Sequence, residues 1–155
     1  MSIVSAENKF KKGLEAFVDR NYVEAAMQFR QAMDVEHQRR IREPDMRYLS
    51  YYGLCCATAH QKIQEGLHAC KRAARVRSRD PEMFLNLGRV YLLAGQKRLA
   101  FDTFQTGLDL NPEHKTLKME SSCLHGQGSK RAAPARQGLL TRMRSAWSRP
   151  ATFSR

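Results

Sequence analysis

The chain has 155 residues, of which 42% are hydrophobic, and its 27 basic and 15 acidic residues give a formal charge of +12. This composition is typical of one folded globular unit and excludes a wholly disordered chain. No stretch approaches the roughly 18 consecutive apolar residues that a membrane-spanning helix needs, and the first residues lack the apolar block of a secretory signal. We therefore expect a single cytoplasmic domain.

The positive charge is concentrated towards the end of the chain. Residues 1–114 contain 18 basic and 14 acidic residues, a balance of +4. Residues 115–155 contain nine basic residues and only one acidic residue, Glu120, which gives a balance of +8. An electrostatic partner is therefore expected for the last quarter of the chain only.

Residues 5–40 are predicted to form two helices that are joined by a tight turn at Arg20 and Asn21. The second helix is expected to be elongated and to run from Tyr22 to about Arg40. This unit carries small and aromatic residues that recur further along the chain, namely Gly13, Ala25, Phe29 and Ala32.

Residues 45–79 repeat the pattern in a weaker form around Gly53. In the second helix of this unit, Gly66, Cys70 and Ala73 take the places of the earlier alanine, phenylalanine and alanine, and the match requires one extra residue in the intervening turn. The motif glycines Gly13 and Gly53 are 40 residues apart, about six more than one repeat of roughly 34 residues. The surplus is expected in an elongated second helix and the turn that Pro44 closes.

Residues 80–111 carry the most complete unit. Gly88 is expected in the middle of a helix, where glycine costs about 1 kcal/mol relative to alanine, so a neighbouring helix should pass close to it. Asn111 and Pro112 are expected to begin the next helix as its N-cap and first-turn proline. The pattern of this unit consists of Phe84, Leu87, Gly88, Tyr91, Ala100, Phe104 and Pro112.

This pattern resembles the tetratricopeptide-repeat signature, with Phe84 in place of the usual tryptophan. The resemblance implies an all-α fold, a right-handed α-solenoid of about three helix-turn-helix repeats. The repeats are expected at about 5–40, 45–79 and 80–111, followed by a capping helix at about 112–124 that closes the domain 5–124.

Residues 125–155 are expected to form a basic, flexible, partly disordered tail with a short amphipathic helix at 138–148. Three alternatives stay open for it: binding to an anionic membrane or nucleic acid, occupation of the domain's own concave face, or no partner at all. Its basic residues include Lys130, Arg131, Arg136, Arg142, Arg144 and Arg149.

In tetratricopeptide-repeat proteins the first helix of each pair lines a concave groove. The resemblance therefore implies a groove for a partner polypeptide, although Leu14 and Leu54 are equally expected in the core. The groove residues expected on this basis are Phe10, Lys11, Leu14, Phe17, Arg47, Tyr51, Leu54, Leu85, Asn86, Arg89 and Leu92.

The best-known subfamily grips the terminal carboxylates of heat-shock chaperones with lysine, asparagine and arginine side chains. This chain departs from that clamp at every position, because the matching residues are Phe10, Leu14, Tyr51, Glu82 and Asn86. Recognition of a chaperone tail is therefore disfavoured. A partner segment anchored by aliphatic side chains is the better match to such a groove.

No motif for catalysis or cofactor binding is found in the sequence. The histidines are scattered, and no phosphate-binding loop or nucleophile elbow is present. A metal site at Cys123 and His125, or at His60 and His68, lacks a second cysteine pair at zinc spacing, and the cysteines are expected to be buried free thiols. The sequence thus predicts a non-catalytic adaptor, scaffold or chaperone-like module without cofactor, with a secretion-type chaperone for an export substrate as the alternative.

Overall fold

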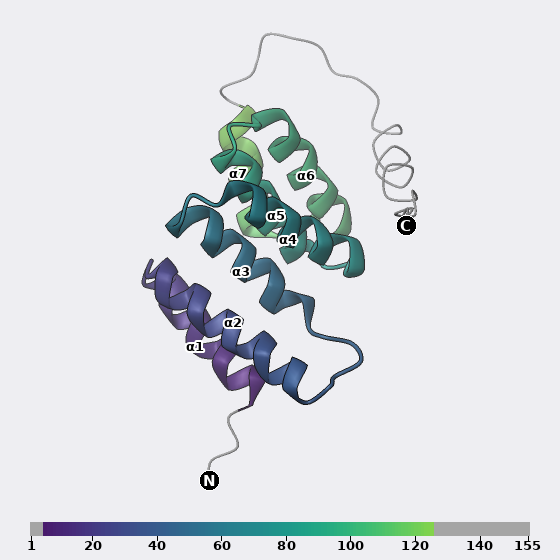
Figure 1. Ribbon diagram of the computed structural model, residues 1–155. Helices are drawn as coiled ribbons and strands as arrows, with labels where there is room; N and C mark the ends of the chain where they lie inside the picture. The colour runs from purple at the N-terminus through teal and green to yellow at the C-terminus, as the bar shows by residue number, and fades with distance from the viewer. Residues whose placement is uncertain (1–4, 126–155) are drawn as a thin grey trace, which may run out of the picture.

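The computed structural model describes residues 5–125, which form seven α-helices and no strand. Successive helices pair into three hairpins that stack one after another, and a last helix closes the stack (Figure 1). The predicted all-α solenoid is confirmed, while the predicted tail lies outside the described residues. The helices are α1 (Ala6–Val18), α2 (Tyr22–Gln38), α3 (Met46–Ala59), α4 (Ile63–Val76), α5 (Pro81–Leu93), α6 (Lys97–Leu110) and α7 (Lys115–His125).

None of these seven helices combines the length and the apolar character that a membrane crossing requires.

A three-residue turn with one left-handed residue joins the two helices of each hairpin. The left-handed residues are Arg20, Gln61 and Gly95, with φ angles of 60°, 53° and 72°. Gln61 follows the motif glycine Gly53 by eight residues, one more than the corresponding distance in the other two hairpins. The second hairpin does contain one extra residue, but that residue lies in α3, which has 14 residues where α1 and α5 have 13, and not in the turn as predicted.

Close contact between a glycine and a phenylalanine sets the helix spacing in the first and third hairpins. A Cβ atom on Gly88 would lie 2.2 Å from Cε1 of Phe104, and one on Gly13 would lie 2.5 Å from Cε1 of Phe29. Both rings are fully buried and cannot swing into solvent. The close helix approach predicted at Gly88 is confirmed.

The second hairpin uses smaller residues at the same positions. Cys70 takes the place of the phenylalanine, is fully buried, and donates its thiol to the carbonyl oxygen of Ser50 at 3.2 Å. A Cβ atom on Gly66 would lie 2.6 Å from the carbonyl oxygen of Gly53, so the backbones of α3 and α4 nearly touch there. The second hairpin therefore has no aromatic ring between its helices. The small residues Gly66 and Cys70 let α3 and α4 approach closely enough to fill that space.

Three of the four cysteines are buried free thiols, whereas Cys123 is exposed. Burial raises the pKa of Cys55 and that of Cys70 to about 12, so both thiols are protonated at physiological pH. Protonated thiols are poor nucleophiles, which assigns these cysteines to packing.

The last helix begins three residues later than the sequence predicts. The side chain of Asn111 accepts the N–H of Glu113 at 3.1 Å and so closes a turn rather than capping the helix. Instead, Nδ1 of His114 accepts the N–H of Leu117 at 3.3 Å, and α7 starts at Lys115. The expected helix start at Pro112 was wrong because asparagine caps a turn as readily as a helix.

The surplus residues of the first repeat lie in α2 and in the connection that follows it. Helix α2 has 17 residues, whereas α4 and α6 have 14 each. The connection ends at Asp45, whose carboxylate caps α3 by accepting the N–H of Arg47 at 2.9 Å. The Arg47 guanidinium contacts the same carboxylate at 2.6 Å, and the Asp45 N–H donates to Glu36 of α2 at 2.9 Å.

We expect replacement of Asp45 by alanine to lower the free energy of unfolding by about 1–2 kcal/mol at pH 7, because a helix cap and a half-buried ion pair are lost. Burial acts to raise the pKa of Asp45, but the hydrogen bonds from Arg47 outweigh it and hold this pKa below its ordinary value. The stabilisation is therefore complete above about pH 4 and is lost as the pH falls through the lowered pKa. Urea unfolding at pH 7 and pH 2 should show a smaller difference at pH 2.

The matched control is Asp34→Ala, at an exposed position within α2, for which a change below about 0.5 kcal/mol is expected. A loss for Asp45→Ala that is equal at the two pH values would contradict a role for the charged carboxylate.

Candidate partner-binding face

The first helices of successive hairpins and the closing helix form one surface, which we call the first-helix face (α1, α3, α5 and α7). Polar contacts link each of these helices to the next. Arg47 on α3 lies 3.2 Å from the carboxylate of Glu7 on α1, and Arg89 on α5 lies 2.9 Å from that of Glu120 on α7. These contacts fix the order of the helices across the face.

Glu82, in the first turn of α5, contacts α3 on one side and the residue that precedes α7 on the other. The hydroxyl of Tyr51 on α3 donates to Oε2 of Glu82 at 3.4 Å, and Nε2 of His114 lies 2.9 Å from Oε1. Because Nδ1 of His114 already accepts the N–H of Leu117, Nε2 carries the proton that is donated to Glu82. The Glu82 carboxylate is thus engaged by two donors.

Tyr51 belongs to an aromatic cluster that joins the first hairpin to α3. Its ring centroid lies 5.7, 5.5 and 5.4 Å from those of Phe10, Phe17 and Phe29. Burial, together with the nearby Glu82, raises the pKa of Tyr51 to about 12, so its hydroxyl is a hydrogen-bond donor throughout the physiological range. The cluster positions one edge of the face and holds its tyrosine in a fixed orientation.

Four of the eleven residues predicted to line the groove are buried in the core. Phe10 packs in the aromatic cluster, and Asn86 is fully buried with its Nδ2 donating to Oγ of Ser50 at 3.1 Å. Leu54 and Leu85 are 4% and 3% exposed and belong to the core of the second and third hairpins. These four residues do not present a side chain to a partner, because adjacent first helices pack on one another through them.

The other seven predicted residues are accessible to different degrees. Lys11 is exposed, and the remaining six are half-buried. Of these, Arg47, Tyr51 and Arg89 already have the partners described above. Apolar surface is therefore left at Leu14, Phe17 and Leu92.

The face also carries three exposed apolar side chains that the sequence analysis did not single out. Val18, Leu93 and Met119 are 78%, 43% and 59% exposed. Val18 lies one helical turn after Leu14 and Leu93 lies one turn after Arg89, while Met119 belongs to α7. Val18 and Leu93 each lie four residues after a residue that the sequence had predicted for the groove, so continuing the same helical spacing for one more turn would have identified both. A depression at the end of α1 is lined by Leu14, Glu15, Val18 and Asp19.

Comparison with solved structures places this arrangement among known folds. The TPR domain of Arabidopsis OM64 superposes with a TM-score of 0.62 at 17% identity, covering 79% of this chain and 96% of that domain. The Sgt2 TPR domain of Aspergillus fumigatus gives a TM-score of 0.62 at 14% identity, covering 84% and 87%. The chain has the tetratricopeptide-repeat fold. No protein-family model matches the sequence, and the comparison with curated proteins finds no match.

Two further solved structures of similar fold contain a bound peptide. The second TPR domain of human RPAP3, in complex with the HSP70 peptide SGPTIEEVD, has a TM-score of 0.60 at 18% identity and covers 77% of this chain and 94% of that one. The Yersinia enterocolitica secretion chaperone SycD, in complex with a peptide of the translocator YopD, has a TM-score of 0.58 at 14% identity and covers 82% and 98%. At these identities the likeness shows the fold alone.

Within residues 5–125, no three His, Cys, Asp or Glu side chains are grouped so that they would hold a metal ion.

Proposed function

We propose that this protein is a non-catalytic binding module that holds a segment of a partner polypeptide on the first-helix face. One observation carries the proposal: exposed apolar side chains lie on a face whose main charged groups already pair with one another. Val18, Leu93 and Met119 are exposed there, while Glu82 and Arg89 are engaged by His114 and Glu120. Apolar anchors on the partner are therefore the main source of affinity.

The face does not suit a segment that ends in carboxylates. Among the positions that match the carboxylate clamp, Phe10 and Asn86 are buried, and Tyr51 donates to Glu82. An incoming carboxylate would meet the negative charge of Glu82, and the arginines of the face, Arg47 and Arg89, already pair with Asp45 and Glu120. The expected occupant is an apolar segment with few acidic residues.

The fold is consistent with this role, since the RPAP3 domain and SycD were both solved with peptides bound. Binding of a partner segment is the step that an adaptor and a chaperone for an export substrate have in common. Binding of lipid or nucleic acid through the tail depends on residues outside the described part of the chain.

The test is a selection of peptides from a random display library on the full chain, followed by measurement of Kd with a fluorescein-labelled selected peptide. We expect Leu93→Asp to weaken binding at least tenfold, because it places a carboxylate on the apolar part of the face. The matched control is Leu99→Asp on α6, since Leu99 is 45% exposed and Leu93 is 43% exposed. The control should change Kd less than about twofold.

A Leu99→Asp variant that loses as much affinity as Leu93→Asp would show that the first-helix face is not the binding surface. As a second check, a peptide of sequence SGPTIEEVD should bind at least tenfold more weakly than the selected peptide. Tight binding of that peptide would contradict the proposed lack of a carboxylate site.

A further inference from the structure

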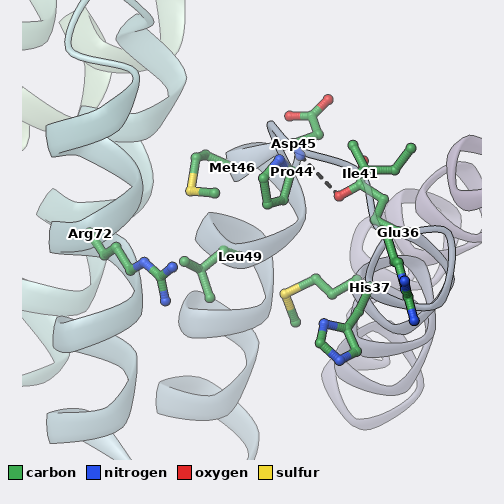
Figure 2. A pocket seen from close by; sticks show the side chains of 10 residues that line it. Glu36, His37, Ile41, Pro44, Asp45, Met46, Leu49 and Arg72 are labelled. Atoms are coloured by element: carbon green, nitrogen blue, oxygen red, sulfur yellow. Dashed lines mark hydrogen bonds between the residues drawn. The ribbon is translucent and has the colours of Figure 1, made fainter.

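A pocket of about 300 Å³ opens between the second helices α2 and α4, with the first turn of α3 at its floor (Figure 2). The end of α2, the connection to α3, the first turn of α3 and one residue of α4 contribute to it. Its volume is at the lower end of the range for small ligand sites, roughly 300–1,000 Å³. The lining residues are Met33, Glu36, His37, Arg40, Ile41, Pro44, Asp45, Met46, Leu49 and Arg72.

The pocket exists because the first repeat is longer than the others. The additional turn of α2 and the connection after it carry the lining residues from Glu36 to Asp45, which the second and third repeats do not have. Met46 and Leu49 form an apolar floor continuous with the core, and Ile41 stands at the rim with 47% of its surface exposed. One large apolar side chain from outside would extend this floor.

The charged groups around the pocket are not balanced. Both carboxylates are engaged, because Glu36 accepts the N–H of Asp45 at 2.9 Å and Asp45 contacts Arg47 at 2.6 Å. Arg40 and Arg72 are exposed and form no ion pair with any residue between 5 and 125. The accessible charge at the rim is therefore positive.

The chain around these two arginines strengthens the positive potential. Between Glu65 and Asp80 it carries five basic residues and no acidic residue, and only Arg77 of the five is paired with carboxylates within residues 5–125. The connection after α2 adds Arg42 next to Ile41 and one exposed acid, Glu43. A surface of this kind raises the local concentration of acidic segments and speeds their association.

We propose that this pocket is a second docking site, which binds an acidic segment of a partner protein through one bulky apolar side chain, with carboxylates of the segment on Arg40 and Arg72. Charge complementarity selects this occupant. The chain's own residues 115–155 have a balance of +8, so they are repelled from a cationic rim, and a second copy would bring the same cationic surface. A membrane is disfavoured because the apolar groups line a recess instead of protruding.

The probe is a fluorescein-labelled 12-residue peptide of glutamate, aspartate and two tryptophans, titrated with the full chain and followed by fluorescence polarisation. A small single pocket is expected to give a Kd in the micromolar range or weaker. We expect the double variant Arg40→Glu/Arg72→Glu to weaken binding at least tenfold, and Ile41→Asp to do so as well. All three side chains are exposed, so the fold should be retained, which thermal unfolding followed by circular dichroism will verify.

The matched control is Lys12→Glu/Arg98→Glu, which makes the same change in net charge at exposed positions outside the pocket and should alter Kd less than about twofold. Because every variant keeps residues 126–155, binding of the acidic probe to that basic segment contributes equally to all of them. Leu93→Asp should also leave this Kd unchanged, which separates the pocket from the first-helix face.

Three results would overturn the proposal. The first is a Kd above about 1 mM for the acidic probe. The second is equal affinity for a probe in which alanine replaces both tryptophans, since the pocket would then contribute nothing. The third is binding to vesicles with 30% phosphatidylserine that Arg40→Glu/Arg72→Glu abolishes, with no effect of this variant on the peptide, because the surface would then recognise a membrane.

Discussion

Replacement of Gly88 by alanine is expected to lower the free energy of unfolding by about 3 kcal/mol or more. Alanine normally stabilises a helix interior by about 1 kcal/mol relative to glycine. Helix propensity alone would therefore make the alanine variant more stable, and the expected loss must come from packing. The methyl group would lie 2.2 Å from the ring of Phe104, which is fully buried. The helices α5 and α6 must move apart to make room for the methyl group, and this movement weakens the packing between them in the third hairpin.

Gly107→Ala is the matched control, because Gly107 is also a buried glycine within a helix of the same hairpin. Its added Cβ atom would meet Cδ1 of Leu117 at 2.8 Å and Cβ of Phe84 at 3.2 Å, both less close than the 2.2 Å approach at Gly88, so a smaller loss is expected. Urea unfolding of both variants measures the difference. A loss for Gly88→Ala no larger than that for Gly107→Ala would rule out the glycine and phenylalanine contact as the determinant of helix spacing.

A double-mutant cycle isolates the contact itself. In a Phe104→Leu background, Gly88→Ala should cost at least about 1 kcal/mol less than in the native background, because the atom that the methyl group meets has been removed. Additive losses would instead mean that the alanine is rejected by some other neighbour.

The regular part of the fold could be predicted because it depends on spacing. Gly13, Gly88 and Ala100 occupy positions where helices cross, and such positions accept only small residues whatever the rest of the sequence is. The extra residue of the second unit was likewise predictable, since Gln61 must take a left-handed conformation at a fixed distance from Cys70. Helix ends were less secure, because Asn111 can cap a turn or a helix.

The accessible part of the first-helix face could not be predicted to the same degree. Helical periodicity places Asn86 and Arg89 on the same face, yet Asn86 is fully buried and Arg89 is half-buried. Their exposure depends on how closely α3 and α5 approach, which is a tertiary property. The contact between Glu82 and His114 spans 32 residues, and no local pattern in the sequence indicates it.

The residues that line the pocket between α2 and α4 could not be predicted from the sequence either. The sequence gives a surplus of residues between the first two repeats, and α2 takes up part of that surplus. Which side chains meet there depends on Arg72, which lies 32 residues after Arg40 on a different helix. The packing of both α2 and α4 on α3 brings the two arginines to one rim.

Restoring the signature phenylalanine at position 70 is expected to destabilise the protein, although it brings the sequence closer to the repeat pattern. Cys70 is fully buried, and its Sγ atom lies 3.0 Å from the position of a Cβ atom on Gly53. In the first and third hairpins the phenylalanine ring packs on a glycine of the facing helix. In the second hairpin the backbones of α3 and α4 are in close contact at Gly53 and Gly66, which leaves no space for a ring. A ring at position 70 must reopen this contact, at a cost of about 3 kcal/mol or more.

Thermal and urea unfolding of Cys70→Phe, compared with Cys123→Phe, measure this cost. Cys123 is an exposed cysteine on α7, so the same chemical change there should alter the free energy of unfolding by less than about 0.5 kcal/mol. Cys70→Ala should lose less than Cys70→Phe, because a small cavity costs less than forced separation of two helices. A Cys70→Phe variant as stable as the native chain would mean that α3 and α4 can adopt the wider spacing of the other two hairpins, and that their close approach is a consequence of Cys70 alone.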